Sequence, residues 1–164
     1  MKLQLVGCSH HASSVSVRER LAFTPQQVEE ALAQLRVRFP QTEAVLLSTC
    51  NRVELYTATE DASLAPSHHE VAEFMATYHG LQLFDVFDDL FERTGEDAVL
   101  HLFTVAAGLD SMVLGEPQIL SQVKQAYDLA CERNSAGPLT HSVFQAAIRT
   151  AKRVTRETEI SRKR

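Results

Sequence analysis

Gly-rich phosphate-binding loops are missing from this sequence, because none of its six glycines stand in the Gly-x-Gly spacing. A site for a dinucleotide cofactor is therefore not expected within the chain. No apolar run approaches the roughly 20 residues that span a bilayer. The first residues also form too short an apolar stretch for a signal peptide. These absences favour a cytoplasmic location.

Cysteine is also scarce: Cys8, Cys50 and Cys131 are an odd number at wide spacing and form no CxxC pair. Neither a disulfide framework nor a zinc ribbon is indicated. Cys8, His10 and His11 are close enough in sequence to suggest half of a metal site, but further ligands are not in view. The alternative is a loop that lines a cleft, and we expect no metal.

Length and charge favour one soluble domain with an acidic body. The 164 residues with 45% apolar content are enough for one domain with a core. Residues 1–139 carry a net charge of −10, whereas residues 140–164 carry +5. The acidic body argues against a generic nucleic-acid binder, although a local patch can still steer such a partner.

The apolar pattern predicts an α+β fold. Strands are expected at residues 3–8, on both sides of Cys50, and in the latter part of 83–92. Helices are expected at about 25–39, 68–79, 95–106 and 118–133, the first two after capping boxes. This order favours a ferredoxin-like antiparallel sheet with packed helices.

A further helix is expected at the C-terminus, where residues 140–164 place Phe144, Ala147, Ile148 and Ala151 on one side. The pattern has no cap before the chain ends, which suggests that the sequence is cut from something longer. We therefore assign residues 1–139 to one domain and 140–164 to the start of a long linker helix.

The strongest candidate for chemistry is Cys50, in a polar turn between two strand patterns. A thiol near the cation of Arg52 is in a setting that favours thiolate. The alternative is a small buried residue, the common fate of a free cysteine, but four polar neighbours argue against burial. A cysteine nucleophile attacks an acyl carbon and forms a thioester.

Several neighbours are suited to help such a nucleophile. Arg52 is suited to a bidentate contact with a substrate carboxylate. Thr49 and Asn51 are suited to donate to an oxyanion or to bind a substrate amine. His101 is the histidine expected near the site, although a partly exposed helix residue is an equal alternative. Glu54 either orients Arg52 or is solvated.

Two long motifs then connect the chain to a known family. They run from Ser48 to Tyr56 (STCNRVELY) and from His101 to Lys124, the latter including GLDSMVLGEPQILSQVK; Gly7-x-x-His10 and Arg18-Glu19-Arg20 open the chain. With these motifs the sequence resembles the N-terminal catalytic domain of glutamyl-tRNA reductase, the first committed enzyme of tetrapyrrole (5-aminolevulinate) biosynthesis from glutamate. One departure is Ser13-Ser14, where Ala-Pro is expected.

The resemblance implies that Cys50 attacks the ester of glutamyl-tRNA(Glu), and that NADPH reduces the resulting thioester to glutamate-1-semialdehyde. It implies that His101 assists ester cleavage or positions the acyl group. The substrate-contact positions that it implies are Thr49, Asn51, Arg52, Ser111, Glu116, Pro117, Gln118 and Gln122.

The family's other parts and partners follow from the same resemblance. An NADPH-binding domain and a helical dimerisation domain, through which the full-length enzyme forms a homodimer, are absent from this chain. The fragment is expected to show at most esterase activity. Glutamate-1-semialdehyde aminomutase is an expected partner of the full enzyme, and a membrane is not. The alternatives are a non-catalytic module that binds tRNA or a partner protein, and a thiol redox sensor.

Overall fold

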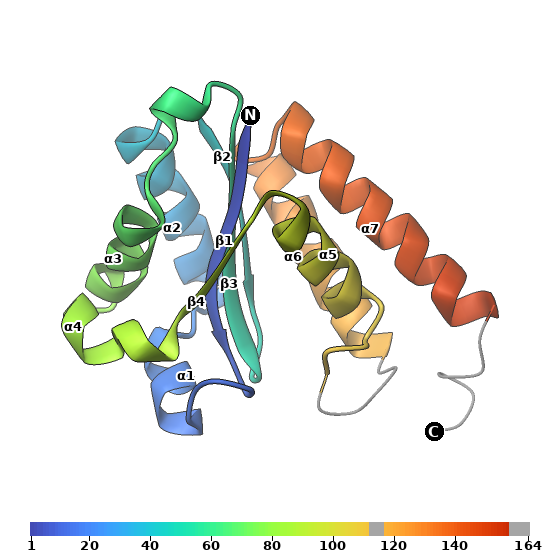
Figure 1. Cartoon of the computed structure of the whole chain (residues 1–164), viewed down its shortest axis with the longest axis horizontal. Helices are drawn as coiled ribbons and strands as arrows, with labels where there is room; N and C mark the ends of the chain where they lie inside the picture. The colour runs from blue at the N-terminus through green and yellow to red at the C-terminus, as the bar shows by residue number, and fades with distance from the viewer. Residues whose placement is uncertain (112–116, 158–164) are drawn as a thin grey trace.

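A four-stranded sheet with helices packed on both faces organises the molecule (Figure 1). The computed structural model describes residues 1–111 and 117–157. In chain order the elements are β1 (Lys2–Ser9), α1 (Val15–Leu21), α2 (Pro25–Arg38), β2 (Thr42–Ser48), β3 (Arg52–Thr59), η1 (Ala62–Leu64), α3 (His68–Tyr78), α4 (Leu83–Val86), η2 (Phe87–Asp89), β4 (Phe91–Thr94), α5 (Gly95–Ala106), α6 (Pro117–Glu132) and α7 (Pro138–Glu157).

The strands follow the order β2-β3-β1-β4, and every neighbouring pair is antiparallel. Helices α2 and α3 lie on one face of the sheet, and α5, α6 and α7 lie on the other (Figure 1). Helix α2 connects β1 to β2, and α3 connects β3 to β4. This is a ferredoxin-like core with added helices, so the predicted fold class is confirmed.

Strand β3 is buried along its whole length because it lies between β2 and β1 in a sheet that is covered on both sides. The alternation of Val53 and Leu55 with Glu54 and Tyr56 therefore does not separate a core face from a solvent face. Of the two alternatives for Glu54, solvation is wrong, since its exposed fraction is 0%.

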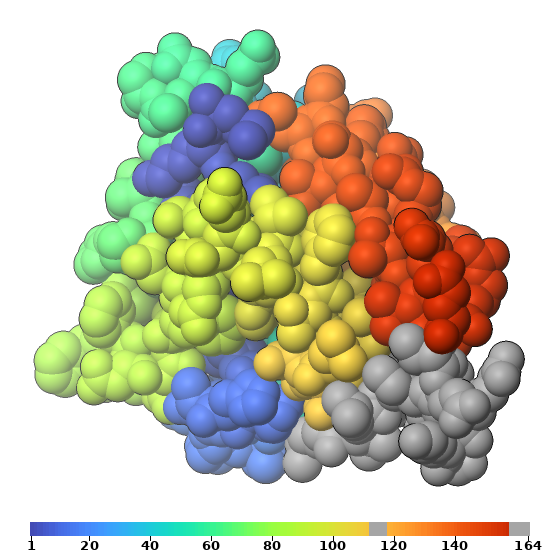
Figure 2. All heavy atoms as spheres, turned by 45° about the vertical axis from the view of Figure 1, so that its right-hand side comes forward, coloured from blue at the N-terminus to red at the C-terminus, as the bar shows by residue number. Residues whose placement is uncertain are grey.

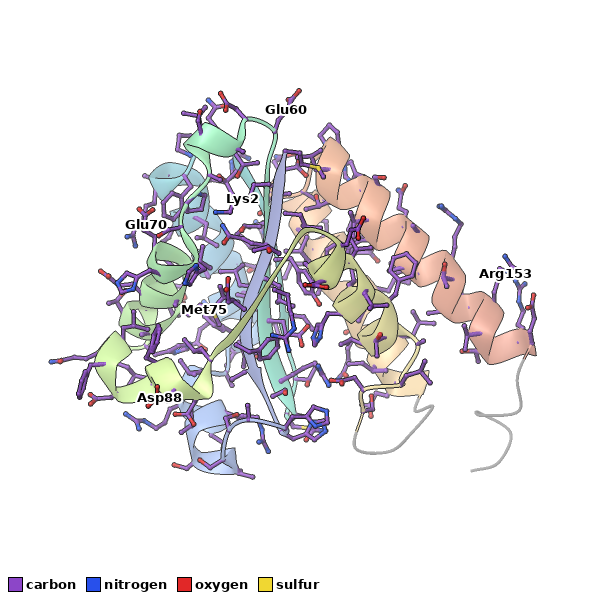
Figure 3. All side chains as sticks on the ribbon, viewed as in Figure 1. Lys2, Glu60, Glu70, Met75, Asp88 and Arg153 are labelled. Atoms are coloured by element: carbon purple, nitrogen blue, oxygen red, sulfur yellow. The ribbon has the colours of Figure 1, made fainter. Side chains whose placement is uncertain are left out.

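Local signals in the sequence predicted most helix starts correctly. Thr24 and Ser67 begin α2 and α3 with the expected capping boxes. Met75 lies on the side of α3 that faces the sheet, whereas Glu70 lies on its outer side (Figure 3). Helix α1 was not predicted, because its short pattern carries only one buried apolar side chain, Leu21. Ser14, at the departure from the family pattern, caps this helix through the N–H of Val17 at 3.3 Å.

In the segment 83–92, the strand predicted for the latter part begins only at Phe91. Leu83, Val86 and Leu90 follow a helical spacing rather than alternation, and α4 and η2 take up residues 83–89. The strand β4 is therefore short and lies at the sheet edge, where it pairs with β1.

Helix α7 packs beside α5 on the same face of the molecule (Figure 2). Its residues Phe144, Ala147 and Ala151 are buried. The carboxylate of Glu43 accepts hydrogen bonds from the backbone N–H groups of Leu139 at 3.2 Å and Thr140 at 2.8 Å. The first turns of this helix thus belong to the core, and the assignment of 140–164 to a linker stays a prediction. Among the described helices, none has the length and apolar character to cross a membrane.

Gly7 gives a first testable prediction, because it lies opposite Glu54 where β1 pairs with β3. A Cβ atom on Gly7 overlaps the carbonyl oxygen of Val53, which is backbone and cannot turn away. We expect Gly7→Ala to cost about 2–3 kcal/mol of unfolding free energy, measured by denaturant titration. Gly137→Ala is the matched control, because the atoms nearest to its Cβ belong to the side chain of Glu43 rather than to backbone. Equal costs for the two variants contradict the expectation.

Candidate active site

The turn that carries Cys50 joins β2 to β3 and is fixed by one side chain. The hydroxyl oxygen of Thr49 accepts hydrogen bonds from the backbone N–H groups of Asn51 at 3.1 Å and Arg52 at 3.2 Å. The N–H of Thr49 donates to the carbonyl of Arg52 at 2.8 Å. A threonine hydroxyl that accepts hydrogen bonds from the N–H groups two and three residues later commonly stabilises a turn. Cys50 is exposed at the tip of this turn.

Two further hydrogen bonds tie the turn to its surroundings. The N–H of His10, just after β1, donates to the carbonyl of Asn51 at 3.1 Å. On the other side, the N–H of Phe23 donates to the hydroxyl of Ser48 at 2.9 Å. The turn is therefore fixed on both sides of Cys50, while the thiol itself is exposed to solvent.

A small pocket of about 80 Å³ opens at the thiol, between the turn and the start of α6. Seven of the predicted site residues meet there: Thr49, Cys50, Asn51, Arg52, Ser111, Gln118 and Gln122. Ile119 also lines the pocket; the sequence predicted it only as an inward residue of α6. Glu116 lies outside the described residues. Pro117 begins α6, but its side chain is outside the description.

Arg52 is almost fully buried, with 1% of its surface exposed, and its charge is used inside the protein. Nη1 donates to Oε2 of Glu54 at 2.7 Å. Nη2 donates to Oδ2 of Asp110 at 2.8 Å and to the backbone oxygen of Asp110 at 2.9 Å. Burial alone would lower the pKa of Arg52, but the charges and hydrogen bonds of the two carboxylates outweigh it and raise the pKa.

Glu54 is the centre of a buried polar cluster. Its Oε2 is 2.7 Å from Nε2 of His101 as well as from Arg52, and its Oε1 accepts from the hydroxyl of Tyr56 at 2.7 Å. Burial alone would raise the pKa of Glu54, but His101, Arg52 and Tyr56 together lower it. Burial and the charge of Glu54 raise the pKa of Tyr56 well above its usual value. Glu54 is thus an anion that orients Arg52, the alternative that the sequence left open.

His101 lies one step behind the pocket rather than in its wall. Only 15% of its side chain is exposed. Its ring contacts Glu54 and lies 5.2 Å from the ring of Phe91, centroid to centroid. The pocket wall, as far as the described residues define it, does not include His101. His101 therefore reaches the pocket through Glu54 and Arg52.

Asp110 and His11 were not among the predicted site residues. Oδ1 of Asp110 is 3.2 Å from Nε2 of His11, while its other oxygen holds Arg52. Burial alone would raise the pKa of Asp110, but Arg52 and His11 lower it. The sequence carried no signal for this contact, because Asp110 lies 58 residues from Arg52 along the chain.

The other two cysteines are less suited to chemistry. Cys8 is buried in β1, and burial raises its pKa to about 11. Cys131 is half-buried, with its sulfur 3.9 Å from Nδ1 of His141. In the described part of the chain, no three His, Cys, Asp or Glu side chains gather as they do around a metal ion.

Comparison with known proteins gives one consistent family. The model of the family described as glutamyl-tRNAGlu reductase, N-terminal domain, matches residues 6–158. Glutamyl-tRNA reductase of Rhodopirellula baltica is 49% identical over 164 residues, which are 100% of this chain and 38% of that protein. The protein of the same name from Pseudomonas aeruginosa is 48% identical over 155 residues, which are 94% of this chain and 36% of that protein.

A solved structure agrees with the sequence matches. Glutamyl-tRNA reductase from Methanopyrus kandleri is similar with a TM-score of 0.77 and 35% sequence identity. The similarity covers 97% of this chain and 35% of that chain. The chain thus spans little more than a third of the length of these relatives.

Proposed function

The chain belongs to the glutamyl-tRNA reductase family as its N-terminal domain, and from this premise we propose that Cys50 is the nucleophile of that enzyme. The proposed substrate is glutamyl-tRNA(Glu), in which an ester joins glutamate to the terminal ribose. The observation that carries the proposal is the shared pocket. An exposed thiol on a fixed turn opens onto polar side chains from Ser111 and the first turns of α6.

The proposed step is an acyl transfer to sulfur. The sulfur of Cys50 attacks the carbonyl carbon of the ester, and the bond from that carbon to the ribose oxygen breaks. The proton of the thiol leaves with the ribose hydroxyl, so the step needs no outside reactant. The glutamyl group stays on Cys50 as a thioester.

The polar residues of the pocket have proposed roles in this step. Thr49 uses its oxygen to accept from the turn, which leaves its O–H free to donate to the substrate. The side-chain amides of Asn51, Gln118 and Gln122 line the same space and are suited to the developing oxyanion and the substrate amine. His101 acts as a positioning residue through Glu54.

NADPH does not fit the described residues of this chain. Dinucleotide sites use a Gly-rich loop between a parallel strand and a helix, whereas the described sheet is antiparallel throughout. We therefore propose that this chain stops at the thioester, which water then hydrolyses. Reduction to glutamate-1-semialdehyde, the homodimer and a contact with glutamate-1-semialdehyde aminomutase are proposed for the longer protein only.

The direct test of the proposal is to trap the thioester. The chain is incubated with tRNA charged with radiolabelled glutamate, quenched in acid and separated on a gel. We expect label on the protein that hydroxylamine removes. Bound tRNA without label supports the non-catalytic alternative, and fast reaction of Cys50 with peroxide in the absence of ester cleavage supports the sensor.

Arg52 gives a second testable prediction, because a single ammonium cannot reproduce the planar fork of a guanidinium. We expect Arg52→Lys to raise the half-saturating concentration of glutamyl-tRNA by about 10- to 100-fold, the value of a charge-assisted hydrogen bond. Glutaminyl-tRNA serves as the matched substrate, since it lacks the carboxylate. If the Arg52→Lys chain discriminates between the two substrates as well as the unchanged chain does, Arg52 does not recognise the substrate carboxylate.

A further inference from the structure

The guanidinium of Arg52 has no free edge for a substrate carboxylate in this structure. A bidentate contact uses two parallel N–H groups, either from Nη1 and Nη2 or from Nε and Nη2. Both edges include Nη2. This nitrogen already donates to the side chain and to the backbone oxygen of Asp110. Asp110 therefore blocks each of the two ways in which Arg52 binds a carboxylate.

The charges around Arg52 also oppose a further anion. The guanidinium is shared by the carboxylates of Glu54 and Asp110, at 2.7 and 2.8 Å. A substrate carboxylate is a third anion on one cation. Like charges at such short range repel strongly when they are shielded from water. One of the two internal carboxylates has to withdraw when the substrate binds.

The burial of the two carboxylates decides which one withdraws. The side chain of Glu54 is 0% exposed and has three partners: Arg52, Tyr56 and His101. The side chain of Asp110 is 22% exposed. Moving Glu54 leaves several buried donors unpaired, whereas Asp110 can turn toward water at lower cost.

His11 provides a second partner for Asp110 on the outer side. Its Nε2 is 3.2 Å from Oδ1 of Asp110, and 59% of its side chain is exposed. Asp110 thus bridges a buried arginine and a surface histidine. When the side chain of Asp110 turns away, one N–H of Nη2 becomes available to the substrate, while the other still donates to the backbone oxygen of Asp110. The carboxylate then keeps its contact with His11 and gains water.

We propose that the carboxylate of Asp110 takes the place of the substrate's side-chain carboxylate in the empty site, where it binds Arg52. When the substrate binds, Asp110 leaves Arg52 and keeps its contact with His11. This inference rests on the proposed function of Arg52.

The test measures binding apart from the chemistry of the thiol. The probe is glutamate α-methyl ester, titrated into the Cys50→Ser chain with and without Asp110→Asn and followed by calorimetry. Asparagine keeps the shape of Asp110 but removes its charge. We expect the probe to bind about tenfold more tightly to the Asp110→Asn chain. Glutamine α-methyl ester is the matched probe, and its affinity is expected to stay the same.

Weaker or unchanged binding of the glutamate ester overturns the proposal, because a residue that only supports Arg52 lowers affinity when it is removed. His11→Ala gives an independent reading, since loss of the outer partner is expected to weaken probe binding. Ester cleavage on glutamyl-tRNA separates this inference from the proposed function. If the chain is inert toward glutamyl-tRNA but Asp110→Asn still tightens binding of the glutamate ester, only the thiol chemistry fails.

Discussion

Replacing Cys50 by serine is expected to lower the rate of the proposed glutamyl-tRNA cleavage by at least about 10³-fold and to remove the acid-stable label from the protein. A serine hydroxyl without an adjacent base is a poor nucleophile at neutral pH, whereas a cysteine always contributes some thiolate. The described contacts of the site do not include a base within hydrogen-bond reach of residue 50 that would activate serine. The measurement is the single-turnover release of labelled glutamate from tRNA.

The fold is expected to survive this change. The side chain of Cys50 is exposed, and the turn is held by the hydroxyl of Thr49 rather than by the thiol. Cys131→Ser is the matched control, because that thiol is accessible in part and lies outside the pocket. Equal activity of the Cys50→Ser and unchanged chains assigns the cleavage to another group.

Replacing Glu54 by glutamine is expected to cost about 3–5 kcal/mol of unfolding free energy, the largest loss of stability among the changes considered. Removing one partner of a buried ion pair leaves the other charge without compensation. Here the charge left behind is Arg52, which is 1% exposed. The amide of glutamine also turns donors toward a site that is already surrounded by the donors of Arg52, Tyr56 and His101.

Denaturant titration at neutral pH measures this loss. Glu73→Gln is the control, because Glu73 makes an exposed ion pair with His69 at 3.6 Å, and such pairs contribute at most about 1 kcal/mol. Equal losses in the two variants mean that the buried cluster adds nothing to stability.

The pH dependence of the unfolding free energy gives a second measure of the contribution of Glu54 to stability. Its pKa is lowered in the folded chain, so the stabilisation is present above the ordinary value of 4.5 and is lost as the pH falls below it. The Glu54→Gln chain lacks this group. We therefore expect a shallower loss of stability in acid for the variant than for the unchanged chain.

The sequence alone was sufficient to predict that Cys50 lies in an exposed turn. Apolar patterns on either side of Ser48–Arg52 predicted the hairpin, and the polar residues between them predicted an exposed turn. These signals are local, since they depend on neighbours along the chain. The polar residues of α6 were identified by resemblance to the family, and the structure brings Gln118 and Gln122 to the same pocket.

The burial of the charged side chains could not be predicted from the local sequence pattern. Alternation along β3 places Arg52, Glu54 and Tyr56 on one face, but it does not tell whether helices cover that face. Burial depends on how α5 to α7 pack, and the space for Glu54 depends on the register that sets Gly7 opposite it. The contact of Asp110 with Arg52 likewise joins segments that no short-range signal connects.

The nucleophile and the arginine stand two residues apart yet differ in how freely they can change over evolution. Cys50 contributes little to the fold, so a lineage can lose the thiol and keep an intact binding module. Arg52 neutralises a buried cluster, so its replacement is expected to destabilise the fold even where the proposed acid preference is no longer needed. New acyl specificities are therefore expected to arise first at Ser111, Gln118 and Gln122, which line the pocket without carrying the charge balance of the core.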